Sequence, residues 1–172
     1  MKKISSIFFL LILSIGIKGQ SQEWKKFDSL VGKCSLFFPY PPQHFQEKTF
    51  LPDEQKMMQY DVYVSEMKGN IFLFLIADYP IPLVKKDLPI ALEGFLRGIL
   101  HRGGELINAN RQESCGYPAL DFFVKKENSL FKGRVQIVGC RLYLLSVEGN
   151  ENNLFEENFQ KFVKSFQLIQ FP

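Results

Sequence analysis

Hydrophobic and polar positions alternate with period two over most of residues 105–149, a pattern typical of half-buried β-strands. The alternation is clearest in three runs, Leu120–Lys125, Phe131–Ile137 and Tyr143–Val147. Short segments containing Gly, Asn or Pro separate the runs, and these residues favour hairpin turns. Because loops this short join antiparallel neighbours, the pattern predicts a four-strand antiparallel meander near the C-terminus.

The N-terminal half predicts further strands. Cys34–Phe38 ends at a group of prolines, and Met57–Met67 alternates in polarity. Ile71–Ala77 is apolar at both odd and even positions, so both of its faces are expected to be covered and the strand to lie centrally. We also predict short strands at Lys48–Phe50 and within Ser165–Ile169.

Two segments have helical periodicity. Leu88–His101 follows Asp87, a possible N-cap, and ends at a Gly-Gly pair; Asn153–Phe166 begins at an asparagine. A short helical turn is predicted at Gln22–Leu30. The two longer helices each carry an apolar stripe that predicts packing on the sheet: Leu88, Leu92, Phe95 and Ile99 in the first, and Phe155, Phe159, Phe162 and Phe166 in the second.

These elements predict one α+β domain, residues 21–172, in which helices pack on an antiparallel sheet whose central strand is covered on both faces. The length of 172 residues fits one domain, and we find no internal repeat or linker. The 15% aromatic content, with 18 Phe, supplies large side chains for the core.

Residues 1–20 have the pattern of a secretory signal peptide. Two lysines precede the apolar run Ile4–Ile17, which is shorter than the ~20 residues of a membrane span. We expect cleavage after Gly19 or Ser21, and export to the periplasm or the extracellular space. An uncleaved leader that anchors the protein is the alternative. No Cys directly follows the apolar run, as a lipoprotein signal would require.

The positive charge of the whole chain comes from this leader. The formal net charge is +3, and removing the leader with its three lysines leaves 18 basic and 18 acidic residues. The basic balance therefore gives no support for a nucleic-acid partner. We expect an unknown envelope protein or a small ligand as partner, with membrane contact only through the leader. Basic residues of the meander form either a binding strip or an ordinary solvated face: Lys125, Lys126, Lys132, Arg134 and Arg141.

Residues for catalysis or metal binding are few. The two histidines, His44 and His101, are expected in a Pro-rich bend and at a helix end, and the sequence has no HxxxH or CxxC spacing. A metal site that combines both histidines with a cysteine is the alternative to no metal site. Nucleophile elbows, phosphate loops and dinucleotide fingerprints are absent from the sequence. Asp121, Glu127 and Glu148 are expected on a solvated face. We predict no catalytic residue, metal or cofactor, and hence a protein that is not an enzyme.

Export to an oxidising compartment would permit a disulfide between two of the three cysteines, Cys34, Cys115 and Cys140, and would leave one thiol free. Strand direction alternates along the meander, so the turns that hold Cys115 and Cys140 lie at the same end of the sheet, ~9–10 Å apart. A disulfide requires Cα atoms ~4.4–6.8 Å apart, which the two turns reach only by leaning together. Cys115–Cys140 is our candidate pair. Cys34 begins a strand and is an alternative partner for either turn.

The order of these elements, with its local motifs, resembles the PsbP and DcrB-like superfamily, which also contains the Mog-type Ran-binding proteins. The matching segments span about residues 34–169: Phe38–Pro42, Ile76–Pro80, Gly103–Leu106, Gly116–Phe122 and Arg141–Tyr143. The chain departs from the family at Tyr40, often Gly, and at Cys115 and Cys140. The resemblance implies an α/β/α sandwich around a central antiparallel sheet, and it implies accessory or binding proteins without a shared catalytic site.

Three functions follow as hypotheses. The first is an exported, non-enzymatic accessory or binding protein of the cell envelope. The second is a small envelope enzyme with a Cys/His site, and the third is a structural envelope component held by an uncleaved leader.

Overall fold

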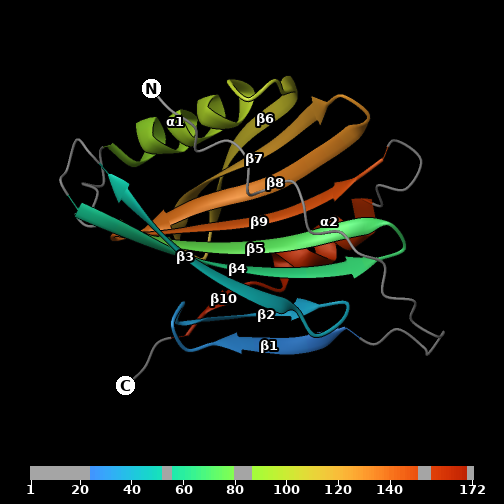
Figure 1. Ribbon diagram of the computed structural model, residues 1–172, viewed down its shortest axis with the longest axis horizontal. Coiled ribbons are helices and arrows are strands. Elements are labelled where there is room, and N and C mark those ends of the chain that lie inside the picture. Colours follow the sequence, from blue (N-terminus) through green and yellow to red (C-terminus); the bar gives the residue numbers. More distant parts are fainter. Residues whose placement is uncertain (1–23, 52–55, 80–86, 151–155, 170–172) are drawn as a thin grey trace.

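The computed structural model describes residues 24–51, 56–79, 87–150 and 156–169. Within these ranges the chain forms two antiparallel sheets and two helices (Figure 1), which confirms the α+β class. The predicted leader, residues 1–20, lies outside the described residues.

The larger sheet has seven strands in the order β3-β4-β5-β9-β8-β7-β6, and all neighbours are antiparallel. The predicted four-strand meander is confirmed as β6–β9. The expected short strand at Lys48–Phe50 is part of a longer edge strand, β3. The strands are β3 Gln43–Leu51, β4 Lys56–Met67, β5 Asn70–Asp78, β6 Glu105–Ser114, β7 Tyr117–Lys126, β8 Ser129–Val138 and β9 Arg141–Gly149.

Strand β5 lies between β4 and β9, as its apolar pattern predicted. Phe72, Phe74 and Ile76 are fully buried on one face of the sheet, and Leu73 and Leu75 pack against the core on the other. The apolar residues at both odd and even positions thus correctly predicted a strand that is covered on both faces.

The smaller sheet pairs strands from the two ends of the chain, in the order β1-β2-β10. Its strands are β1 Lys25–Ser29, β2 Cys34–Phe38 and β10 Gln167–Leu168. The helical turn predicted at Gln22–Leu30 is wrong, because Lys25–Ser29 pairs along its whole length with β2. The charged residues around Phe27 obscure the strand pattern in the sequence. In the structure, Phe27 packs on the core beside Phe38.

Two helices cover opposite faces of the large sheet (Figure 1). Helix α1, Leu88–Leu100, packs on β7 and β8, and helix α2, Glu156–Lys164, packs on β9 and β2. The buried stripe of α1 is Leu88, Leu92 and Leu96, whereas Phe95, predicted as a core residue, is only partly buried. Neither helix in the described ranges has the length and hydropathy of a membrane span.

The small sheet lies on the same face of the large sheet as α2, so one outer layer is part helix and part sheet. This arrangement brings the β1–β2 turn, Leu30–Lys33, over the ends of β5 and β9. The polar contacts made there define the site described below.

Candidate functional site

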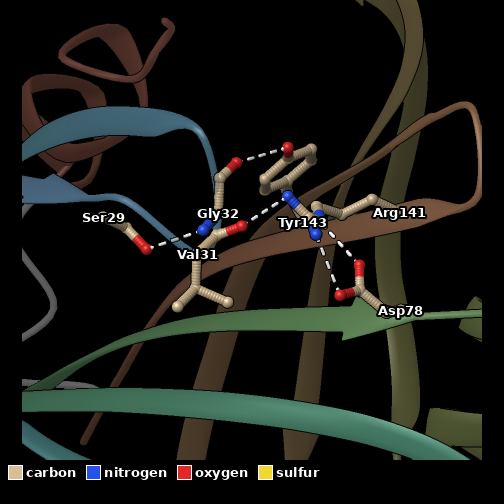
Figure 2. A network of polar contacts seen from close by, with 6 residues as sticks. All are labelled: Ser29, Val31, Gly32, Asp78, Arg141 and Tyr143. Atoms are coloured by element: carbon tan, nitrogen blue, oxygen red, sulfur yellow. Dashed lines mark hydrogen bonds and ion pairs between the residues drawn. The ribbon is translucent and has the colours of Figure 1, made fainter.

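Arg141, the first residue of β9, holds the centre of a polar network (Figure 2). Its guanidinium donates two parallel hydrogen bonds to the carboxylate of Asp78, with Nη2 2.9 Å from Oδ2, and Nη1 donates to the carbonyl of Val31 at 2.6 Å. Asp78 and Arg141 are cross-strand partners at the ends of β5 and β9. Bidentate pairs of this kind fix orientation as well as charge. We call Arg141, Asp78 and their contact to Val31 the clamp.

Two further contacts fix the shape of the β1–β2 turn (Figure 2). The Tyr143 hydroxyl donates to the carbonyl of Gly32 at 2.7 Å, and the Gly32 N–H donates to Ser29 Oγ at 2.9 Å. The contacts of Arg141 with Val31 and of Tyr143 with Gly32 each join residues more than 100 positions apart in the sequence. Side chains of β1 and β9 contact the turn directly, and Asp78 of β5 orients one of them, Arg141.

Gly32 is required by its neighbours. A Cβ atom at this position would lie 2.5 Å from Ile76 Cδ1 and 2.9 Å from Cys34 Sγ, too close for either pair. The turn therefore lies directly against the core. The next residue, Lys33, has φ of 49°, a left-handed conformation that closes the turn.

The electrostatics of the site follow from these contacts. Hydrogen bonds and the charge of Asp78 raise the pKa of Arg141 against the opposing effect of burial. Burial raises the pKa of Tyr143 to about 12, and it also raises the pKa of Cys34 to about 12. Tyr143 and Cys34 are therefore neutral at physiological pH, and the only charges in the network, on Arg141 and Asp78, neutralise each other.

The clamp presents two exposed apolar side chains. Leu30 is 75% exposed and Val31 49%, the first being the most exposed large hydrophobic residue of the described chain. A flexible turn would lose entropy on binding a partner, whereas this one is held in place by side chains of the core. The arrangement suits recognition by apolar contact, since its donors and acceptors are used internally.

The two histidines considered in the sequence as metal ligands or catalytic groups, His44 and His101, lie on different elements, β3 and the end of α1. His44 lies on β3, not in the predicted bend, with Nε2 2.7 Å from the buried Asp61 Oδ1 and its ring stacked on Tyr63. Gln46 donates to the same Asp61 oxygen at 3.1 Å. His101 is exposed at the end of α1. The described residues contain no group of three or more His, Cys, Asp and Glu placed to bind a metal.

The three cysteines all have free thiols in the structure. Cys34 is buried at the start of β2, Cys115 is exposed in the β6–β7 turn, and Cys140 is half-buried in the β8–β9 turn. Cys115 Sγ contacts the carbonyl of Phe166 at 3.6 Å. The Cys115–Cys140 disulfide is therefore unformed here, and the pairing stays a prediction for oxidising conditions.

The expected basic strip contains three cations that are paired with carboxylates. Arg134 binds Asp121 through two hydrogen bonds of 2.7 and 2.9 Å, Lys132 pairs with Glu156 of α2, and Arg141 pairs with Asp78. Asp121 therefore takes part in a specific ion pair, contrary to the prediction of a solvated carboxylate. Carboxylates thus neutralise three of the five cations expected in this strip.

A small cavity of about 50 Å³ lies between α1 and the start of β7. Pro89, Leu92, Arg111 and Pro118 are among its lining residues. It has room for a few water molecules and is far below the ~300–1,000 Å³ of small-ligand pockets. We therefore place the candidate site at the clamped turn.

The sequence analysis singled out two residues of the clamp, Asp78 and Arg141, but in separate motifs. It missed the turn that contains Val31, because the strand before this turn, β1, was predicted to be helical. A run of two apolar residues followed by glycine, Leu30–Gly32, is the local signal of an exposed tight turn, but it needs the β1 assignment to be recognised.

Comparisons with known proteins support the fold. No protein-family model matches the chain, and no curated protein matches it in sequence. Among solved structures, the fold is similar to the solution structure of cyanobacterial PsbP (CyanoP) from Synechocystis sp. PCC 6803. The TM-score is 0.59 at 16% sequence identity, over 91% of this chain and 98% of that one. The chain therefore has a PsbP-like fold.

Proposed function

We propose that the protein is an exported, non-enzymatic accessory or binding protein of the cell envelope, and that the clamped turn Leu30–Lys33 is its partner-binding surface. The clamp carries this proposal, because it uses a bidentate ion pair to hold the backbone of a turn that presents two exposed apolar side chains. Rigid apolar side chains on a fixed backbone make good binding anchors, since little entropy is lost when the partner arrives.

Three lines of reasoning support export and a binding role. Residues 1–20 have the signal-peptide pattern, with periplasmic or extracellular location as the expected result. The balanced charge of the remaining chain argues against nucleic acid as the partner. The PsbP-like fold agrees with the wider grouping that we propose, with the DcrB-like and Mog-type Ran-binding proteins, whose members are mostly accessory or binding proteins.

A direct test places a photo-crosslinking amino acid at position 30 or 31 in cells. Position 90, where Ile90 is 63% exposed on α1, is the matched control. We expect crosslinks to one envelope partner from positions 30 and 31 and none from position 90. Adding Arg141→Met should weaken these crosslinks, because it removes the hydrogen bond that holds the Val31 carbonyl. Equal crosslinking from all three positions, or none from position 30, would contradict the proposal.

The contact between His44 and Asp61 favours a second candidate, an envelope enzyme with a Cys/His site. A buried carboxylate that orients an imidazole is a feature of catalytic bases. Among the described residues, however, no cysteine, serine or threonine side chain hydrogen-bonds to His44. Alkylation of the native thiols at pH 7 distinguishes the two: a rate that falls in His44→Gln supports the enzyme, and an unchanged rate supports the binding protein. An uncleaved leader as envelope anchor is tested separately by the N-terminus of the exported protein.

A further inference from the structure

The second surface of interest is the edge strand β6, at the opposite end of the sheet from β3 (Figure 1). Among the described strands, only β7 pairs with β6, so its outer edge has no strand partner there. Its residues are exposed or half-buried throughout, so the other described elements leave this strand accessible to solvent. Open strand edges with accessible N–H and C=O groups are templates for pairing with another chain.

The usable length of this edge is well defined. A register irregularity between Leu106 and Asn108 interrupts pairing at one end, and the turn at Cys115 and Gly116 ends the strand at the other. The segment between them, Asn108–Ser114, pairs regularly with β7. It contains one cation, Arg111, and one anion, Glu113, on the same face as α1.

These two charges select one antiparallel register for a second copy of the same strand. Pairing centred on Gln112 places Arg111 of each copy opposite Glu113 of the other, so that two opposite-charge pairs form by symmetry. Pairing centred on either charged residue places like charges opposite each other. Pairing centred on Asn108 brings Arg111 opposite Glu105 but must cross the irregularity after Leu106.

The same register covers exposed apolar surface at both ends of the strand. Leu106 is 43% exposed and Ile107 49%, so adjacent large hydrophobic residues meet solvent on this edge. In the two-fold arrangement they approach the β6–β7 turn of the other copy, beside which Tyr117 is 37% exposed. Arg111 also binds Glu93 of α1, and its five donors allow it to contact both carboxylates.

We propose that two copies of this protein associate by antiparallel pairing of their β6 edges, with Arg111 of each copy opposite Glu113 of the other. This inference is independent of the proposed function, because β6 takes no part in the clamp. The two seven-stranded sheets then form one continuous sheet, and the clamped turns remain open for their partner.

A charge swap tests both the association and its register. The molecular mass of the chain without residues 1–20 is measured by sedimentation from about 1 to 200 μM, and we expect a concentration-dependent dimer. Arg111→Glu or Glu113→Arg alone should weaken the dimer about tenfold, because each creates two like-charge contacts. The double variant, Arg111→Glu with Glu113→Arg, should restore it.

The matched control exchanges Lys26 and Asp28, an exposed ion pair on β1 in the small sheet. This swap should leave the association unchanged. Circular dichroism of every variant verifies that the fold is intact. A monomer at 200 μM would overturn the proposal, and so would single reversals without effect or a double variant that fails to restore the dimer.

Discussion

The two faces of the seven-stranded sheet are packed in different ways. The face under α2 and the small sheet is aromatic, and Phe72, Phe74, Phe159 and Phe162 are all 0% exposed. The face under α1 is mostly aliphatic, and its one helical phenylalanine, Phe95, is only partly buried. The clamp lies on the aromatic face, whereas α1 leaves its face partly open. We infer that the aromatic face supplies most of the rigidity on which the clamp depends.

The contact geometry on the aromatic face supports this inference. Phe162 makes edge-on contacts with both Phe38 and Phe72, with ring centroids 5.2 and 5.5 Å apart, and so connects α2 to both sheets. Phe166 contacts Tyr143, whose hydroxyl binds the turn. A chain of ring contacts runs from α2 to the residue that binds the β1–β2 turn, through Phe162, Phe38, Phe27, Tyr63, Phe74 and Tyr143. No comparable chain reaches the β6 edge in the described part of the molecule.

The largest loss of stability is expected from a substitution in the aromatic face. Phe159→Ala should lower the free energy of unfolding by ~3–5 kcal/mol, because the side chain is fully buried and its removal leaves a cavity. Phe95→Ala on the other face should cost ~1–2 kcal/mol, since part of that ring already contacts water. Chemical denaturation measures both. Equal losses for the two variants would contradict the difference between the faces.

The next prediction separates the clamp from ordinary ion pairs. Arg141→Met should cost ~2 kcal/mol in unfolding free energy, because it leaves the Asp78 carboxylate and the Val31 carbonyl without their donor. It should also speed amide hydrogen exchange at residues 30–33. Arg134→Met is the matched control, because Arg134 forms a similar bidentate pair with Asp121 on the same sheet.

The control should lose similar stability but leave exchange in the turn unchanged. If both variants loosen residues 30–33 to the same extent, the turn responds to general destabilisation and the clamp has no specific role.

Effects of opposite sign are expected from two glycine substitutions. Gly32→Ala should cost ~1–3 kcal/mol, because its Cβ would overlap Ile76 Cδ1 and Cys34 Sγ. Gly98→Ala in α1 has no atom within 4 Å of the new Cβ, so it should stabilise the protein by ~0.5–1 kcal/mol through helix propensity. Thermal unfolding of both variants shows whether each substitution stabilises or destabilises the protein. A neutral Gly32→Ala would mean that the turn moves away from the core at little cost.

Sequence reasoning recovered the elements whose signals are local. The four strands of the meander were predicted within one or two residues, because alternation and turn residues agree at each boundary. Strand β1 was missed, because only Phe27 of its five residues is apolar and pairing with β2 decides its conformation. Phe95 was misplaced, because the stripe of α1 fits either Leu96 or Phe95 until the helix is docked.

The clamp was beyond sequence reasoning for a related reason. The ends of β5 and β9 are adjacent only because β9 crosses over to pair with β5, so Asp78 and Arg141 meet 63 residues apart. A strand order cannot be read from local periodicity. The ion pair of Arg134 with Asp121 could not be predicted either, although it joins neighbouring strands. Charged residues give the same polar pattern in the sequence whether they are solvated or form ion pairs.

The last prediction uses the buried thiol next to the clamp. Burial raises the pKa of Cys34 from 9.0 to about 12, so the folded state keeps this thiol neutral at pH values where the unfolded chain ionises it. Its contribution to stability is therefore fully present below pH 9 and is lost as the pH rises towards 12. At pH 10 the loss should be about 1 kcal/mol. Cys34→Ala should remove that part of the alkaline slope, whereas Cys115→Ala, at an exposed position, should keep it.

Tyr143 adds to the same alkaline loss, because burial raises its pKa from 10.0 to about 12. Tyr143→Phe should therefore flatten the slope above pH 10, at the cost of its hydrogen bond to Gly32. Unfolding free energies measured from pH 7 to 11 in these variants assign the two contributions. An alkaline slope that stays the same in Cys34→Ala would mean that the thiol reaches solvent in the native state, and the turn above it would then be looser than the clamp implies.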